Sequence, residues 1–280
     1  LFAIHPVQVE TVCWISASKI VLSTFFYLSA LICYIQYMRN SKWQYLLASV
    51  VSSILAMGCK EQSVIIVPCL LLFDWMLFKR NMRSLKVYIE KVYYLIPAIA
   101  IFIVTLVANK NTGEEIIGYT IVDRFIFLCY SSFKYLLISA IPFKLSYLYP
   151  FPFQVGEKIP MALWIYPFVI LFIGYVIYLN RRKPLLVFCT LFFILHLLPV
   201  LHVIPLPRYV VAADRYLYIP YIAFAIGLSI LSYHLYERQR KWILYAGFLY
   251  CSYLCVYTAG YAPASVSYTH LRAHETKANL

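Results

Sequence analysis

Long apolar segments alternate with short polar segments along most of this chain. A helix needs about 20 apolar residues to cross the hydrocarbon core of a bilayer. Segments close to this length occupy residues 20–38, 43–58, 63–78, 93–109, 121–141, 161–179, 185–204, 216–236 and 242–257. The pattern predicts an all-α polytopic membrane protein, a transmembrane bundle of about eight or nine helices. Residues 142–160, which are rich in Pro and aromatic residues, predict a non-regular loop.

Clusters of Lys and Arg predict how the bundle is oriented, because cytoplasmic loops are enriched in these residues. We place four clusters on the cytoplasmic side: Arg39 with Lys42, the connection at 79–91, and the clusters at 181–183 and 238–241. The alternation fails if residues 121–141 cross the membrane once. Because this segment also carries three charges, we predict that it lies in the membrane plane, is re-entrant, or crosses and returns before residue 160.

This orientation brings the remaining polar groups to one face. Residues 1–19, the Lys60-Glu61 pair and the loop from Arg208 to Arg215 all fall on the extracytoplasmic side. None of them has the pattern of a simple positive-inside anchor. We therefore expect the functional site on that face.

Composition narrows the class of protein and of partner. The chain has 63% hydrophobic and 12% charged residues, whereas soluble domains carry about 25% charged residues. The net charge is +13, but the bases lie in short clusters between apolar segments. This arrangement favours anionic lipid headgroups over nucleic acid as the partner. The eight Cys form no Cys-x-x-Cys pair and are interpreted as small buried apolar residues.

His5 and Glu10 are the candidate catalytic residues. His5 precedes Pro6, which favours a turn, and Glu10 lies one turn further if Pro6 opens a helix. A carboxylate at a membrane surface can be a general base, a metal ligand or a hydrogen-bonding anchor. The simpler alternative is a helix N-terminus with ordinary polar residues. No metal site is predicted, since His270 and His274 have helical i,i+4 spacing but lack a third ligand.

Several cations are candidate binding groups for a lipid-linked phosphate. A compact ammonium suits phosphate at Lys60, and guanidinium groups at Arg208 and Arg215 can bind it bidentately. Glu61 and Asp214 are the supporting acids. The alternatives are a local Lys60–Glu61 ion pair and interfacial anchoring through Asp214 with either Arg. We interpret Asp74 as a polar helix-end residue, and His196, His202 and His234 as structural.

These residue types fit one chemistry. A transferase that uses a polyprenyl-phosphate sugar needs a base for the acceptor hydroxyl, cations for the leaving phosphate and apolar helices for the lipid. Two alternatives stay open: a non-catalytic membrane scaffold, and a transporter of lipid-linked sugars.

Three sequence blocks carry a resemblance. Residues 1–16 (LFAIHPVQVETVCWIS) resemble the LFAxHPxxxExVxWI block of the membrane O-mannosyltransferases with C-terminal tetratricopeptide repeats, and of their bacterial relatives. Residues 56–75, with AMGCKE and VPCLLLFDW, and residues 213–220 (ADRYLYIP) are similar to two further blocks in the same order. Residues 145–150 (LSYLYP) match a loop of that family more weakly.

The resemblance implies a GT-C type bundle with its active side in the periplasm or the endoplasmic reticulum lumen. It implies transfer of mannose or a related sugar from a polyprenyl-phosphate donor to a Ser or Thr hydroxyl of a protein. The expected location is the bacterial inner membrane, or the endoplasmic reticulum membrane in a eukaryote. A requirement for a divalent metal stays open.

The chain also departs from the family pattern. Where the family has Arg, often Arg-Lys-Asp, only Lys19 keeps a charge, and we include it among the phosphate-binding candidates. The family's acidic catalytic loop would precede residue 1, and the repeats would follow the last helix. We therefore expect a transmembrane domain at 1–264 that is an inactive fragment of an enzyme. The polar stretch at 265–280 is similar to translated sequencing-adapter sequence, and we expect an unstructured, artefactual tail there.

Overall fold

The computed structural model describes residues 1–108, 118–146, 148–202, 210–237 and 242–278, with the backbone alone from residue 264 onward. Ten α-helices form the described chain, and the one β-type pairing in it is an isolated bridge between Tyr149 and Ala212. Among the described residues, four helical segments are long and apolar enough to cross a membrane: Ile15–Asn40, Leu85–Ala108, Met161–Leu179 and Trp242–Pro263. The prediction of an all-α polytopic membrane protein is confirmed.

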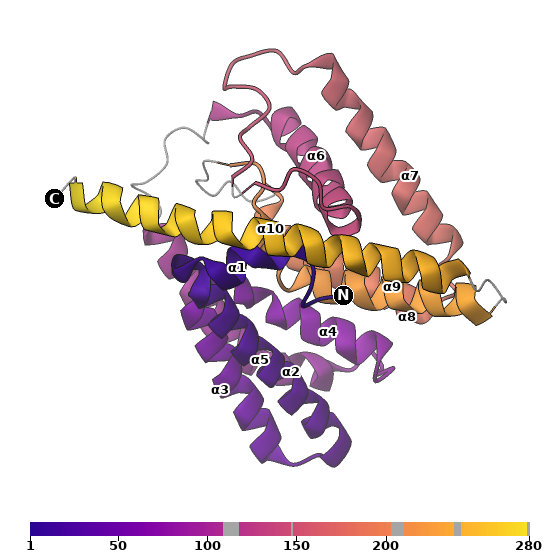
Figure 1. Cartoon of the computed structure of the whole chain (residues 1–280). Helices are drawn as coiled ribbons and strands as arrows, with labels where there is room; N and C mark the ends of the chain where they lie inside the picture. The colour runs from indigo at the N-terminus through magenta and orange to yellow at the C-terminus, as the bar shows by residue number, and fades with distance from the viewer. Residues whose placement is uncertain (109–117, 147, 203–209, 238–241, 279–280) are drawn as a thin grey trace.

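The N-terminal half is a bundle around α2 (Ser18–Asn40), α3 (Trp43–Cys59) and α5 (Leu85–Ala108), with α4 (Ile66–Met76) beside it (Figure 1). Hydroxyl groups connect the three long helices inside an apolar environment. The Ser49 hydroxyl of α3 donates to the Ala30 carbonyl of α2 at 2.7 Å, and Tyr94 of α5 donates to Ser49 at 2.8 Å. Such short interhelical hydrogen bonds stabilise helix contacts where the surrounding solvent is apolar.

The C-terminal half packs against one side of this bundle (Figure 1). The helices α8 (Pro184–Leu197) and α9 (Pro220–Glu237) pack on each other, and α6 (Ile121–Ala140) packs on α7 (Ile165–Leu179). The last helix, α10 (Trp242–Ala278), lies against the N-terminal η1 (Pro6–Gln8) and α1 (Val9–Cys13) (Figure 1). There the Thr258 hydroxyl donates to the Ile4 carbonyl at 2.8 Å. Short 3-10 helices complete the described part: η2 (Ile15–Ala17), η3 (Glu61–Ile65), η6 (Met161–Trp164), η7 (Leu198–Val200) and η8 (Asp214–Leu217).

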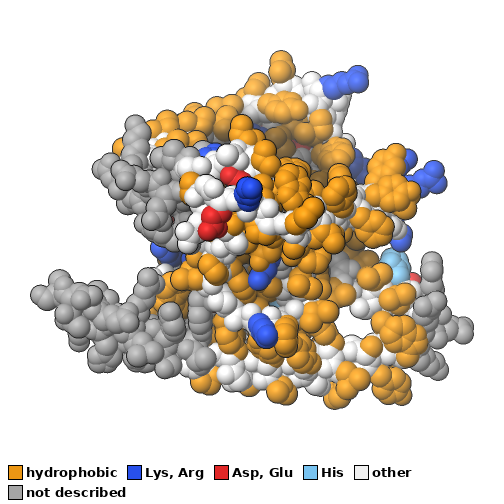
Figure 2. Space-filling model, turned by 90° about the horizontal axis from the view of Figure 1, so that it is seen from above, with side chains coloured by type: hydrophobic (Ala, Val, Ile, Leu, Met, Phe, Trp, Pro, Cys, Tyr) orange, Lys and Arg blue, Asp and Glu red, His pale blue; other side chains and the backbone are white. Residues whose placement is uncertain are grey.

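Apolar side chains cover most of the face shown in Figure 2, and the charged side chains there are scattered. No residue of the helix α7 (Ile165–Leu179) is buried. Leu171, Phe172 and Tyr175 on α7 are each more than half exposed. A helix that is apolar all round and unburied within the protein is typical of a lipid-facing span.

The structure differs from the sequence-based predictions at the start of α5 and at the end of α10. The helix α5 begins at Leu85 rather than at 93, because Val87, Glu90 and Lys91 are buried and extend its inner face. The backbone of α10 is helical to Ala278, so the expectation of an unstructured tail from 265 was wrong. The proposed domain boundary at 264 stays a prediction.

The segment predicted at 121–141 is the helix α6, and one of its three charges has a local role. Thr120 and Asp123 form a reciprocal capping box at the N-terminus of α6, with Asp123 accepting from the Thr120 N–H at 2.7 Å. Its placement in the membrane plane stays a prediction. The loop expected at 142–160 is confirmed, since the described residues there form no helix.

The turn between α2 and α3 yields a prediction about stability. Ser41 closes α2 with a φ of 53°, a left-handed conformation that strains a residue with a Cβ. We expect Ser41→Gly to raise the free energy of unfolding by about 0.5 kcal/mol. The matched control Ser52→Gly, inside α3, is expected to lower it by about 0.5 kcal/mol. Thermal unfolding in detergent measures both, and an equal loss in the two variants would contradict the strain argument.

Candidate functional site

His5 lies at the N-terminal end of η1, as its capping residue. Its Nδ1 accepts a hydrogen bond from the Val7 N–H at 3.3 Å and so caps η1. The ring packs on Tyr221 with 4.3 Å between centroids and has no exposed surface. Within the described residues, Nε2 has no hydrogen-bond partner. Burial lowers the pKa of His5 to about 4, so the imidazole is neutral at ordinary pH.

Glu10 holds Arg215 at both ends of that residue. One carboxylate oxygen accepts from the Arg215 backbone N–H at 2.8 Å, and the other accepts from its Nη1 at 2.6 Å. Glu10 has no exposed surface, whereas the Arg215 side chain is 17% exposed. The guanidinium also lies over the rings of Trp14 and Tyr216, at 5.5 and 5.2 Å. Burial raises the pKa of Glu10, although the Arg215 charge and its hydrogen bonds oppose that rise.

Asp214 lies in a second buried group, whose partners differ from those of Arg215. Its Oδ1 accepts from the Tyr149 hydroxyl at 3.0 Å, and the Lys134 ammonium lies 4.2 Å from the Tyr149 ring centroid. Burial, and after it the nearby Glu10 carboxylate, raises the pKa of Asp214 well above its ordinary value. Glu10 and Asp214 therefore have different environments: the first is paired with a cation, and the second favours the protonated form.

Lys60 and Glu61 form an ion pair of 3.1 Å at the start of η3, as one of the two sequence-based interpretations expected. Burial would raise the pKa of Glu61, but the Lys60 ammonium, and more weakly Lys19, brings it below its ordinary value. Lys19 is exposed at the first turn of α2. These three residues thus form one local group of charges.

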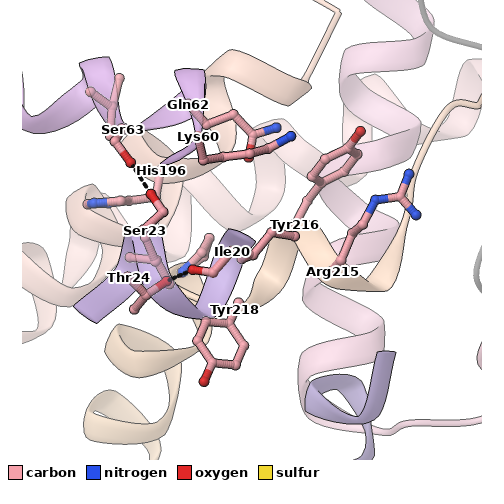
Figure 3. Close-up of a pocket in the computed structure, with 13 residues that line it drawn as sticks. Ile20, Ser23, Thr24, Lys60, Gln62, Ser63, His196, Arg215, Tyr216 and Tyr218 are labelled. Atoms are coloured by element: carbon pink, nitrogen blue, oxygen red, sulfur yellow. Dashed lines mark hydrogen bonds between the residues drawn. The ribbon is translucent and has the colours of Figure 1, made fainter. Parts of the chain in front are cut away.

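A small pocket lies between this group and Arg215 (Figure 3). Its polar wall includes Lys60 and Gln62 from the η3 segment, and Arg215 and Tyr216 from η8. The hydroxyls of Ser23 and Ser63, which also line the pocket, lie 2.7 Å apart. The remaining lining residues are Ile20, Thr24, Ile65, His196, Tyr218, Ile219 and Pro220. Its volume of about 30 Å³ has room for little more than one water molecule.

The structure therefore brings part of the predicted set together. Lys60 and Arg215, which are 155 positions apart in the sequence, line one pocket. Glu10 contacts Arg215 from outside the pocket, and neither His5 nor Asp214 lines it. Arg208 lies outside the described residues. Within those residues, no group of three His, Cys, Asp or Glu side chains is placed to hold a metal ion.

Sequence reasoning missed three parts of the site: Tyr149, Trp14 as a ring under Arg215, and the serine wall of the pocket. Lys134 was a signal for the first, because a cation within an apolar segment needs a partner. His196 was expected to be structural, and its two ring nitrogens lie 2.8 Å from the Phe192 carbonyl and from the Tyr27 hydroxyl. It also forms part of the pocket wall.

We expect a large interaction energy between the side chains of Glu10 and Arg215. A double-mutant cycle with Glu10→Gln and Arg215→Gln should give an interaction energy of about 2 kcal/mol, because the carboxylate is buried and is left without its cation in the single variant. The exposed His234–Glu237 pair, 3.7 Å apart, is the control and should give less than about 0.5 kcal/mol. Thermal unfolding measures both cycles. Equal values would show that the buried pair contributes no special stability.

The buried His5 is expected to make the free energy of unfolding depend on pH. The unfolded chain binds a proton at His5 below about pH 6.5, whereas the folded chain binds it only below about 4. Stability is therefore complete above pH 6.5 and falls between 6.5 and 4, with a slope of at most about 1.4 kcal/mol per pH unit. His5→Asn keeps a cap acceptor but does not titrate, so the slope in unfolding temperature should flatten. An unchanged slope would assign the pH dependence to other groups.

Comparisons with known proteins identify no relative of this chain. No family model, no curated protein and no solved structure matches the chain.

Proposed function

We propose that this chain is a membrane glycosyltransferase domain that binds a polyprenyl-phosphate sugar at the pocket between η3 and η8. One observation carries the proposal. Lys60 and Arg215 come from distant segments, and both line a single pocket at the end of the spanning helix α2. Two cations at one pocket suit a phosphate group, and a guanidinium held in place suits it better than a mobile one.

The fixed position of Arg215 supports this assignment. Glu10 holds both its backbone and its guanidinium, and the rings of Trp14 and Tyr216 limit the side chain further. A cation that is positioned before the substrate arrives loses little freedom on binding and can stabilise the charge that develops on a leaving phosphate. Glu10 then acts as a positioning residue for Arg215. The Glu10 carboxylate is enclosed, so a base for the acceptor hydroxyl is expected elsewhere.

The apolar part of the pocket wall supports a lipid-linked substrate. Ile20, Ile65 and Ile219 line the pocket beside the two cations. A polyprenyl phosphate has the same division into a charged head and a hydrocarbon chain. Because the pocket holds about 30 Å³, the η3 and η8 segments must move apart to admit a sugar.

The finer assignments depend on the three sequence blocks. These assignments are that the transferred group is mannose or a related sugar, that the acceptor is a protein Ser or Thr hydroxyl, and that the site lies on the periplasmic or lumenal face. The bacterial inner membrane, or the endoplasmic reticulum membrane in a eukaryote, is the proposed location.

Binding of a photoactivatable polyprenyl phosphate to the chain in nanodiscs tests the proposal. We expect Lys60→Gln and Arg215→Gln each to weaken crosslinking about tenfold, since each removes a charged hydrogen-bond donor. The control is Arg181→Gln, which removes an exposed cation stacked on Tyr178 in the connection before α8.

Lys60→Gln keeps the proposal testable if Arg215→Gln impairs folding through Glu10. Crosslinking that is unchanged in a folded Lys60→Gln variant would overturn the phosphate assignment. A similar loss in Arg181→Gln would show that the probe responds to net charge alone. Arg215→Ala is expected to depress sugar transfer while membrane insertion is retained.

A further inference from the structure

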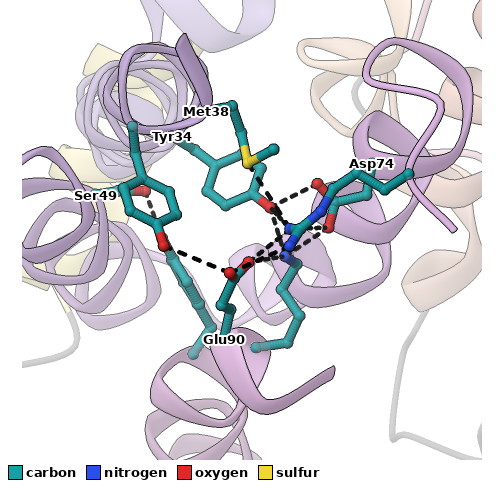
Figure 4. Close-up of polar contacts among 9 residues, drawn as sticks. Tyr34, Met38, Ser49, Asp74 and Glu90 are labelled. Atoms are coloured by element: carbon teal, nitrogen blue, oxygen red, sulfur yellow. Dashed lines mark hydrogen bonds and ion pairs between the residues drawn. The ribbon is translucent and has the colours of Figure 1, made fainter. Parts of the chain in front are cut away.

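A second group of charges lies away from the pocket, where α2, α4 and α5 meet (Figure 4). Asp74 of α4 accepts from the Tyr34 hydroxyl at 2.6 Å and pairs with the Lys91 ammonium at 2.7 Å. Arg80 reaches Asp74 at 3.4 Å and donates through Nη2 to Glu90 at 3.1 Å. The sequence-based interpretation of Asp74 as a simple helix-end residue is therefore replaced by a role at the centre of an ionic network.

This network is internally neutral. Its two acids, Asp74 and Glu90, are matched by two bases, Arg80 and Lys91. The Asp74 side chain has no exposed surface, and those of Lys91 and Glu90 are 4% and 10% exposed. Neither acid is therefore available to balance cations on the surrounding surface.

The backbone conformation at Lys79 turns Arg80 toward the network and leaves Lys79 exposed. Lys79, three residues after the end of α4 at Met76, has a φ of 48°, in the left-handed region. The Arg80 N–H donates to the Asp74 carbonyl at 2.9 Å, which fixes this reversal of the chain. As a result, Arg80 points into the network while Lys79 is exposed.

The exposed charged side chains of residues 39–59 and 66–91, the segments next to this network, are all positive. Residues 39–91 contain three acids: Glu61, which pairs with Lys60 at the pocket, and the two acids of the network. Five cations in the same stretch are exposed, and we call them the basic surface: Arg39, Lys42, Lys79, Arg83 and Lys86.

The basic surface also lies at a membrane boundary. The spans Ile15–Asn40 and Leu85–Ala108 each have one end in it. Trp43 and Trp75, which are 66% and 53% exposed, lie beside it in sequence. Exposed tryptophan rings at the ends of spans are typical of the headgroup region of a bilayer.

We propose that the basic surface binds the headgroups of anionic phospholipids in the membrane that holds the protein. The argument is charge complementarity: a surface of five cations, from which the local acids have been withdrawn into the core, faces phosphate diesters at the depth of the interface. The proposal is independent of the function assigned to the pocket at the other end of α3.

The test is the apparent Kd of detergent-solubilised protein for phosphatidylglycerol, measured by native mass spectrometry. The variant is Lys42→Gln/Lys86→Gln, which leaves the ionic network and the strained Lys79 unchanged. The control is Lys144→Gln/Lys158→Gln, two exposed lysines in the loop between α6 and α7.

We expect the Kd for phosphatidylglycerol to rise at least fivefold in the first variant, because each cation near an anionic surface contributes about fivefold. The control variant should stay within about twofold, and phosphatidylcholine should bind equally to all three proteins. Thermal unfolding checks that both variants retain the fold of the wild type.

Three outcomes would overturn the proposal. The first is an unchanged Kd in a folded Lys42→Gln/Lys86→Gln variant. The second is an equal rise in the control, which would assign the effect to net charge. The third is displacement of the lipid by inorganic phosphate but not by chloride at equal ionic strength, which would make the surface a site for soluble phosphate.

Discussion

The contact between Glu10 and Arg215 is the interaction on which the site depends. It joins the first turns of the chain to the segment before α9, and it places a carboxylate with no exposed surface against a guanidinium at the pocket. A buried carboxylate is costly without a cation, so the two segments are stable only together. The same contact holds both the backbone and the guanidinium of Arg215, as the proposed recognition of a phosphate requires.

Pairing of buried charge also organises the other end of the bundle. Asp74 and Glu90 are held by Arg80 and Lys91 between three helices, and this neutral network leaves only cations on the surface around it. Both ends of the bundle thus depend on the pairing of buried charges, with different results. At the pocket, the paired cation Arg215 forms part of the wall, whereas at the basic surface the paired charges are withdrawn and the remaining cations are exposed.

Much of the fold was predictable because the transfer of apolar side chains out of water acts on each segment separately. The sequence located the beginning of eight of the long helices to within a few residues, and it placed Lys60 beside Glu61 because neighbours in the chain are neighbours in space. The start of α5 was missed, since Glu90 and Lys91 read as loop charges until their partners on other helices are known.

The sequence by itself determined the class of the protein, the order of its apolar helices and the set of cations that could meet a phosphate. Only the tertiary structure decided which acid each cation meets. Glu10 and Arg215 are 205 positions apart, and Arg80 points inward although Lys79 beside it is exposed. No local pattern encodes these choices, because the free energy of a buried ion pair depends on which helices pack together and on how much water they exclude.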